Sequence, residues 1–260
     1  MSDFARLPSL LETRAYGRSF DFREETGSTN DDAREAADRG VVRGHVVLAE
    51  SQTRGRGSRG RVWSSPPKTD LYLSIVEQSG LAPRIVPTLT LAVGLGVRDA
   101  CAVLLGATPL CGTKRVQVKC PNDVWLEGRK VAGILVEASS VGSAMGPIII
   151  GIGLDVNRAE WSDELRPLAT SLREAGGRDW DRAEVLKTLL QCVEARVDAH
   201  LLGGPEVTVR ALREHLALVS ERVRVDEREG VLLGLNAEGA LLLDVDGRAV
   251  PVHAGTLRRA

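Results

Sequence analysis

The sequence predicts an α+β protein, in which a mixed, largely antiparallel sheet is flanked by helices and followed by a small C-terminal SH3-like β-barrel. In the first half, strand-like runs follow one another through hairpin-type turns, which does not fit a doubly wound nucleotide-binding fold. From Ser220 onward, short apolar runs alternate with turn signals such as Asp246-Gly247. We therefore expect a large domain over residues 1–217 and a small one over 218–260.

The N-terminal segment leads into a helix start that is rich in small polar residues. Residues 1–27 contain a short apolar pattern and a predicted strand around residues 20–23. The polar residues 27–32 precede a good helix former that stops at Gly40, so they are expected to cap a helix. The same hydroxyl and amide groups at a helix start are also suited to bind a polar ligand.

An arginine- and glycine-rich segment, residues 52–63, follows a predicted buried strand at residues 45–49. This Arg/Gly loop has four arginines among three glycines and no acidic residue. Glycine lets the backbone approach a ligand closely, and clustered guanidinium groups favour phosphate or carboxylate. The alternative is a solvated turn with scattered charge. A second strand, at residues 71–76, anchors the far end of the loop in the sheet.

The rest of the large domain is predicted from hydrophobic periodicity and turn signals. Residues 88–105 are apolar all round, as expected of a helix that packs against the sheet. A polar link is expected over residues 139–146, and a long helix begins at a capping-box-like segment near Asp181. The remaining predicted strands cover residues 116–119, 130–137, 148–150, 222–225, 230–235, 240–245 and 249–252, and a short helix covers 208–216.

Composition limits the class of partner. The chain has 260 residues and a net charge of −1, which argues against general adhesion to nucleic acid or to a membrane. The apolar run at residues 85–97 is too short to span a bilayer, and the N-terminus lacks the pattern of a signal peptide. The four cysteines form no CxxC pair and no metal-ligand spacing with histidine. We expect reduced thiols, no metal site and a cytoplasmic protein.

Three common catalytic or binding motifs do not fit the polar clusters. The four histidines lie outside these clusters, so no Ser/His/Asp triad is indicated. The glycine-rich loop lacks the GKS or GKT ending that a P-loop needs to hold phosphate and magnesium. Residues 55–60 formally match GxGxxG, but an arginine stands where a dinucleotide site needs a close helix start.

Four motifs in this order resemble the biotin protein ligases: STN at residues 28–30, GRGSRGRVW at 55–63, KCPNDVWLEGRKVAGILVE at 119–137 and GIGLDVN at 151–157. The tail at residues 229–258 is similar to the family's small C-terminal barrel. The resemblance implies a core shared with lipoyl and octanoyl transferases and related to class II aminoacyl-tRNA synthetases. The chain resembles the short form of these ligases, which has no N-terminal DNA-binding domain.

The resemblance also implies a two-step reaction. Biotin and MgATP give biotinyl-5'-AMP and pyrophosphate, and a lysine of a biotin carboxyl carrier protein then takes the biotin. The first step brings a carboxylate onto the α-phosphate, so cations must hold both anions. A cation about 4 Å from such charge contributes roughly 4 kcal/mol at an effective dielectric near 20. Lys130 and Arg56 are the expected cations.

By the same resemblance, particular residues receive roles in a catalytic biotin- and ATP-binding domain. The catalytic group is Lys130, Arg56 and Asp123. The biotin site is Ser28, Thr29, Asn30, Gln52, Arg56, Gly57, Ser58, Lys130 and Gly133. The ATP and adenylate site is Gly55, Arg59, Arg61, Trp63, Asn122, Lys130 and Asp155.

Some of these roles stay open. Trp63 is expected to stack on adenine, and a core tryptophan is the alternative. Asn122 and Asp123 are expected to orient phosphates, magnesium or the incoming amine, in a division that the sequence leaves undecided.

The chain departs from the family pattern at three positions. Ser58 replaces the third arginine of the usual GRGRxGR, and a neutral side chain there should hold the adenylate less firmly. Cys120 replaces a tryptophan and is expected to widen the wall of the ligand pocket. Position 155 is aspartate in this chain, whereas the family pattern commonly has asparagine there.

Other functions remain as alternatives. A lipoate or octanoate transferase would share the core, and the intact Arg/Gly loop disfavours it. A biotin-binding regulatory protein and a binder of single-stranded RNA are the others; the lack of an N-terminal DNA-binding segment argues against the first and the balanced charge against the second. The expected partners are biotin, ATP and the carrier protein, with no nucleic acid or membrane. A homodimer is possible through an exposed sheet edge.

Overall fold

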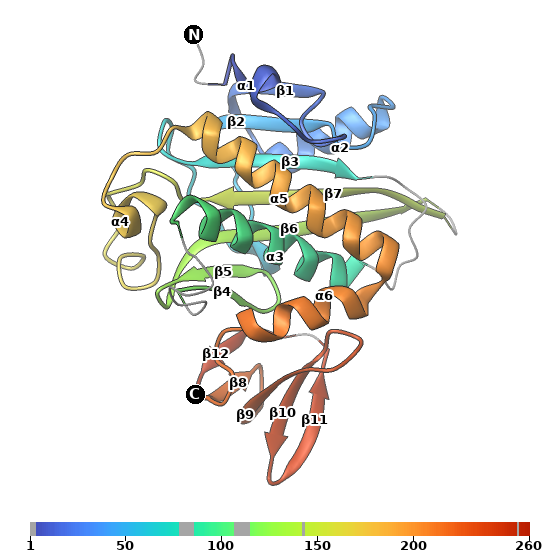
Figure 1. The fold of residues 1–260 in the computed structure, drawn as a ribbon, viewed down its shortest axis with the longest axis vertical. Helices are drawn as coiled ribbons and strands as arrows, with labels where there is room; N and C mark the ends of the chain where they lie inside the picture. Colours follow the sequence, from blue (N-terminus) through green and yellow to red (C-terminus); the bar gives the residue numbers. More distant parts are fainter. Residues whose placement is uncertain (1–3, 78–85, 107–114, 142–143, 254) are drawn as a thin grey trace.

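The computed structural model describes residues 4–77, 86–106, 115–141, 144–253 and 255–260. A large sheet forms the centre of the molecule, helices cover it, and a smaller sheet lies at one end (Figure 1). Cys111, one of the four cysteines, lies outside the described residues, whereas Cys101, Cys120 and Cys192 are free thiols.

The large sheet has the order β1-β2-β3-β7-β6-β5-β4. Its strands are β1 Phe20–Thr26, β2 Val46–Gln52, β3 Leu71–Glu77, β4 Val116–Lys119, β5 Asp123–Leu126, β6 Arg129–Val141 and β7 Ala144–Leu154. Only β1 and β2 run parallel, and every other neighbouring pair is antiparallel. The predicted mixed, largely antiparallel sheet is therefore confirmed.

Alternation along the strands sends side chains to two faces, and each face is covered differently. On one face, Val46, Leu48 and Ile75 join the main hydrophobic core with α3 Val86–Leu104 and α5 Arg182–Gly203. On the other face, Val47 and Ile149 pack against the short amphipathic helix α2 Thr29–Asp38. Because α2 covers only part of that face, the neighbouring part is available for the Arg/Gly loop.

Helix α3 is long and apolar enough to cross a membrane by length and composition. Sixty-seven per cent of its Pro87–Leu104 window is buried, and it packs between the large sheet and α5. It is therefore a core helix, as its apolar circumference predicts.

The C-terminal strands form a five-stranded antiparallel sheet in the order β11-β10-β9-β8-β12. They are β8 Arg222–Val225, β9 Arg228–Leu235, β10 Leu241–Val245, β11 Arg248–Val252 and β12 Leu257–Arg259. Their core continues into Leu91 and Leu95 of α3 and into α6 Pro205–Leu212. The small β-structure is present as predicted, and the boundary between residues 217 and 218 stays a prediction.

Some elements differ from the expectation. The described residues of the predicted polar link at 139–146 are instead strand, since Ser140 pairs with Met145 and Val141 with Ala144. Residues 142 and 143 of this link lie outside the described residues. Tertiary pairing overrides polar composition there. Strand β12 and three short helical segments were not predicted, and these segments are α1 Leu7–Leu10, α4 Leu172–Gly176 and the 3-10 turn η1 Ser58–Gly60. The short helix expected at 208–216 is α6 followed by the 3-10 turn η3 Arg213–His215.

Candidate active site

A cavity of about 40 Å³ lies over the middle strands of the large sheet, beside the start of α2 and under the Arg/Gly loop. Most of the residues that the sequence assigned to ligand binding line it together: Ser28, Thr29, Asn30, Gln52, Arg56, Gly57, Ser58, Trp63, Asn122, Lys130 and Gly133. Gly55, Arg59, Arg61, Asp123 and Asp155 do not line it. Segments up to about one hundred residues apart therefore converge on one site.

The floor of the cavity is made of glycines on neighbouring strands. Gly133 of β6 pairs with Gly153 of β7, and Gly151 lies two residues earlier on β7. A Cβ at Gly151 would stand 2.3 Å from Oδ1 of Asn30, so only glycine fits. The sequence analysis identified Gly133 and missed the other two, although the GIG spacing puts both on one face of a strand.

The indole of Trp63 lies flat on this floor. A Cβ at Gly133 would be 2.7 Å from its Cζ3, and one at Gly153 would be 2.4 Å from its Cε2. The indole Nε1 is buried and has no hydrogen-bond partner among the described residues. Trp63 thus belongs to the cavity and not to a hydrophobic core cluster.

Lys130 stands over the same ring and is held by a buried carboxylate. Its Nζ is 5.1 Å from the centre of the Trp63 ring and 2.6 Å from Oδ1 of Asp123. The other oxygen, Oδ2 of Asp123, lies 3.4 Å from Nζ of Lys119. The hairpin β5–β6 brings these charges onto adjacent strands, where Asp123 pairs with Gly133 and Trp125 pairs with Lys130.

The polar end of the cavity is a network around the start of α2. Gln52 accepts hydrogen bonds from the backbone N–H and the hydroxyl of Thr29, at 3.0 and 3.2 Å. The hydroxyl of Ser74 lies within hydrogen-bond distance of Oγ1 of Thr29 and Oδ1 of Asn30, and Asn30 donates to Glu137 at 2.8 Å. Ser28 is the residue before the helix, but its side chain makes no capping hydrogen bond. The cluster therefore offers both donors and acceptors to a ligand.

Arg56 is ion-paired with acidic residues that the sequence analysis did not identify. Its guanidinium makes two hydrogen bonds to Asp31, at 2.8 and 2.7 Å, and a longer one to Glu137 at 3.4 Å. The Arg56 hydrogen bond is the main cause that lowers the pKa of Asp31. An anionic ligand would have to compete with Asp31 and Glu137 for this guanidinium.

The Arg/Gly loop is fastened to its surroundings by several of its own residues. Ser58 accepts a hydrogen bond from Asn122 at 2.9 Å and another from Arg61 at 2.8 Å. Arg59 reaches the C-terminal sheet and pairs with Asp226 at 3.0 Å. Gly55 lies at the base of the loop, where a Cβ would stand 2.4 Å from the carbonyl oxygen of Trp63.

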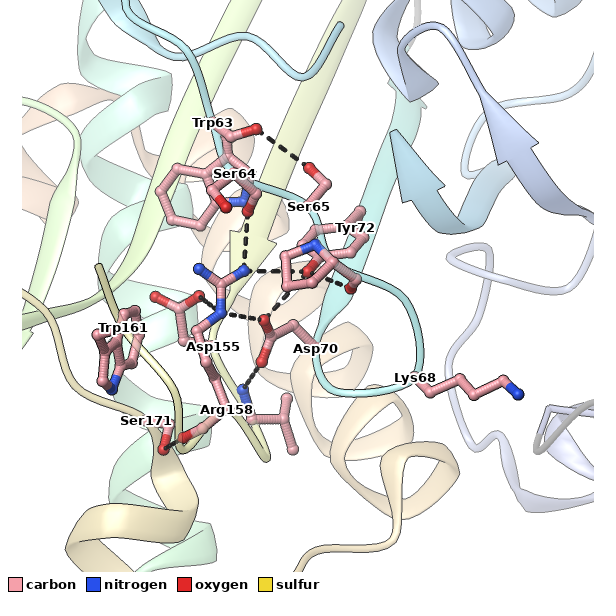
Figure 2. A network of polar contacts seen from close by, with 12 residues as sticks. Trp63, Ser64, Ser65, Lys68, Asp70, Tyr72, Asp155, Arg158, Trp161 and Ser171 are labelled. Atoms are coloured by element: carbon pink, nitrogen blue, oxygen red, sulfur yellow. Dashed lines mark hydrogen bonds and ion pairs between the residues drawn. The ribbon is translucent and has the colours of Figure 1, made fainter. Parts of the chain in front are cut away.

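A buried polar network lies next to the tryptophan (Figure 2). Arg158 donates to Asp70 at 2.8 Å and to the carbonyl of Ser64 at 2.9 Å, so it also fixes the chain directly after Trp63. Its Nε lies 3.8 Å from Oδ1 of Asp155, an oxygen without a hydrogen-bond partner among the described residues. Burial, followed by the Asp70 carboxylate, raises the pKa of Asp155 well above its ordinary value.

The sequence is similar to a family of biotin and lipoate ligases and to individual biotin ligases. The model of the biotin/lipoate A/B protein ligase family matches residues 27–155. The biotin–[acetyl-CoA-carboxylase] ligase of Mycobacterium tuberculosis is 35% identical over 249 residues, which cover 92% of this chain and 88% of that protein. The bifunctional ligase/repressor BirA of Bacillus subtilis is 32% identical over 243 residues, or 91% of this chain and 72% of that protein.

The fold agrees with the same family. The biotin protein ligase of Aquifex aeolicus, solved with biotin and ATP, superposes with a TM-score of 0.80 and 29% identity. The match covers 94% of this chain and all of that one, 100%. Both the large sheet and the C-terminal part of this chain therefore have counterparts in a solved structure.

Proposed function

The chain belongs to the biotin protein ligases, and from this premise we infer that it attaches biotin to protein in two steps. It is an ATP-dependent ligase: biotin and ATP give biotinyl-5'-AMP and pyrophosphate, and a lysine of a biotin carboxyl carrier protein then displaces AMP. The observation that supports this most directly is Lys130, which stands over a floor of glycines at the centre of the cavity.

Lys130 is proposed as the main catalytic cation. In the first step a biotin carboxylate oxygen bonds to the α-phosphorus, and the bond to the bridging oxygen of pyrophosphate breaks. Both reactants are anions, so a positive charge fixed between them stabilises the transition state more than the separated substrates. The ion pair with Asp123 fixes Lys130 before the substrates bind, which lowers the cost of reorganisation.

The two ends of the cavity suit the two substrates. The cluster of Thr29, Asn30 and Gln52 has the donors and acceptors that the ureido ring of biotin requires. Flat glycine backbone and the Trp63 indole suit the planar adenine at the other end. We assign the remaining predicted residues accordingly: Ser28, Arg56, Gly57, Ser58 and Gly133 to biotin, and Gly55, Arg59, Arg61, Asn122 and Asp155 to ATP and the adenylate.

Magnesium is proposed to enter with ATP as part of the substrate. No group of three or more His, Cys, Asp or Glu side chains with metal-ligand geometry occurs in the described part of the chain. Asp123 is the carboxylate nearest to Lys130, and two lysines already neutralise it. Phosphate oxygens are therefore the better ligands for the ion.

The second step needs a neutral lysine amine from the carrier protein. Asp123 is proposed to receive or orient its proton, since it is the buried carboxylate next to Lys130. The division of work between Asp123 and Asn122 is part of this proposal. A cytoplasmic location and a homodimer paired through a sheet edge remain proposals as well.

The test is pyrophosphate release from MgATP in the presence of biotin, lipoate, octanoate or no acid. Release that depends on biotin, followed by transfer to a carrier domain, is the expected result. Release with lipoate or octanoate alone would assign the site to the acyl transferases that share this core. Tight biotin binding without any release would indicate a regulatory biotin-binding protein.

A further inference from the structure

The Arg/Gly loop folds into a small hairpin whose tip contacts the C-terminal sheet. Arg56 bridges Val62 across this hairpin, and at its base the backbone N–H of Trp63 donates to the carbonyl of Gly55 at 2.9 Å. The tip is the 3-10 turn η1 Ser58–Gly60. The tip and the indole that lies on the cavity floor therefore belong to one hydrogen-bonded unit.

The tip buries little of its own surface. Residues 59–62 are exposed, and the side chain of Val62 is 84% exposed. From the large domain, Asn122 donates a hydrogen bond to Ser58 at 2.9 Å. A segment with little buried surface opens at a low cost in free energy, so each contact to the tip affects how long the loop stays closed.

Arg59 joins the tip to the C-terminal sheet. Its Nη1 donates to Oδ1 of Asp226 and to the hydroxyl of Thr256, each at 3.0 Å. The backbone of Arg59 has φ 59° and ψ 38°, in the left-handed region that is unfavourable for a residue with a Cβ. Such a conformation persists where the surrounding contacts fix it. The contacts with Asp226 and Thr256 are placed to hold Arg59 in this conformation.

The acceptor of this contact is itself fixed by the sheet. Asp226 lies in the turn between β8 and β9, and β8 pairs with β9 on one side and with β12 on the other. Oδ1 of Asp226 also accepts the backbone N–H of Thr256 at 3.0 Å. The hydrogen bond from Thr256, followed by the one from Arg59, lowers the pKa of Asp226. A charged carboxylate is therefore held in place opposite the tip at neutral pH.

The ion pair between Arg59 and Asp226 lies outside the active-site cavity. Gly57 and Ser58 of the same hairpin line that cavity, whereas Arg59 and Asp226 do not. The contact between Arg59 and Asp226 therefore acts on a ligand through the position of the loop.

We propose that the C-terminal sheet holds the Arg/Gly loop closed through Asp226, and that this contact prolongs the retention of biotinyl-5'-AMP. Asp226 is then a positioning residue, which touches no reacting atom. The inference rests on the proposed ligase activity. Biotinyl-5'-AMP is a mixed anhydride that water hydrolyses, so the protein has to enclose it until the lysine of the carrier arrives. A loop that opens less often releases less of the intermediate.

The test measures how fast biotinyl-5'-AMP leaves the protein. The protein is loaded with synthetic biotinyl-5'-AMP that carries a radioactive phosphate, an excess of unlabelled compound is added, and the bound label is followed over time. Asp226→Asn should raise the dissociation rate about two- to fivefold, the range expected for the loss of an exposed ion pair. The variant keeps the turn, because asparagine also adopts the positive φ of position 226 and its side-chain oxygen still accepts the N–H of Thr256.

Two further measurements show whether the charge of Asp226 is the cause. Dissolved ions screen an exposed ion pair, so the ratio of the Asp226→Asn rate to the wild-type rate should fall toward one as NaCl rises from about 0.05 M to about 1 M. In a protein that already carries Arg59→Gln, the addition of Asp226→Asn should have no further effect, because the partner of Asp226 is already lost.

Glu221→Gln is the matched control. It removes another exposed ion pair of the C-terminal part, between Arg259 of β12 and Glu221 at 2.8 Å. It should leave the dissociation rate of biotinyl-5'-AMP unchanged. Thermal unfolding of Glu221→Gln and Asp226→Asn shows that both variants are folded.

Each other outcome would overturn the proposal. An unchanged dissociation rate in Asp226→Asn would mean that Asp226 does not hold the loop. An equal increase in Glu221→Gln would indicate a general loosening of the C-terminal sheet, and an effect that salt does not reduce would mean that Asp226 acts through the turn and not through its charge. If the wild type neither forms nor retains biotinyl-5'-AMP, the proposed function itself fails, and this result is distinguishable because it needs no variant.

Discussion

The indole of Trp63 lies against the backbone of Gly153, so closely that a Cβ on Gly153 would stand 2.4 Å from ring atom Cε2. The two residues are 90 positions apart in the chain. Their contact joins the end of the Arg/Gly loop to the central strand β7, at the end of the cavity where we propose that adenine binds. A substitution that adds a side chain at Gly153 therefore tests whether a ligand lies on the glycine floor of the cavity.

Gly153→Val should abolish adenylate formation, by roughly a hundredfold or more, because the side chain would occupy the place of the indole and of any flat ligand. Ile150→Val is the matched control: Ile150 is a buried core residue of the same strand that does not line the cavity, so the change should cost about 0.5 to 1.5 kcal/mol of stability with little loss of activity. Biotinyl-5'-AMP formation and thermal unfolding are measured for both variants. Full activity of Gly153→Val would contradict a ligand on this floor.

Lys130→Ala should keep the fold and reduce adenylate formation by about two to three decades, since it removes the cation that we propose stabilises the reacting anions. The control is Arg129→Ala, which removes an adjacent charge that pairs outside the cavity with Glu174 at 3.0 Å. Pyrophosphate release under saturating biotin and MgATP is the measurement. Near-normal release by Lys130→Ala would exclude Lys130 from the mechanism.

The serine at position 58 leads us to predict that biotinyl-5'-AMP escapes from the site. Because its side chain is neutral, the adenylate should be held less firmly, and biotin should appear on proteins other than the carrier. Ser58→Arg should reduce this bystander labelling several-fold, with Thr53→Arg, an exposed position of the same loop, as the control. Labelling is read on an added non-acceptor protein. A wild type that leaves this protein unlabelled while fully active on its carrier would refute the leak.

From the raised pKa of Asp155 we predict that the free energy of unfolding depends on pH. The pKa of Asp155 is raised in the folded state, chiefly by burial and then by Asp70, so folding favours the protonated carboxyl. Its contribution to the free energy of unfolding is complete below the unfolded value of 3.8 and is lost as pH rises through the folded pKa. Asp155→Asn should therefore raise the free energy of unfolding more at pH 8 than at pH 4. We expect a gain at pH 8 of about 1 to 3 kcal/mol, the cost of an uncompensated buried polar group.

Urea unfolding at both pH values measures this difference, and Asp163→Asn, at an exposed position, is the control. An equal effect of Asp155→Asn at the two pH values would mean that Asp155 does not change its protonation between them. The same variant should still bind ATP, because an amide has both a donor and an acceptor, as a protonated carboxyl does.

The sequence alone determined the fold class and predicted most of the residues that line the cavity. The hairpin strands, the helices and the small C-terminal sheet follow from local patterns of apolar residues and turns, which do not depend on distant contacts. The predicted residues of the cavity were found because they occur in short motifs at the ends of strands and at one helix start. Such motifs predict which residues lie near a ligand, but they do not predict which ion pairs the charged residues among them form.

Only the tertiary structure decided which charges meet. The pairing of Arg56 with Asp31 and Glu137, and the sharing of Asp123 between Lys119 and Lys130, depend on loop position and on strand register. The placement of Trp63 on Gly153 depends on a contact between residues that are 90 positions apart in the chain. Coulomb energy depends on distance and burial, and both are properties of the folded chain, so sequence motifs do not carry this information.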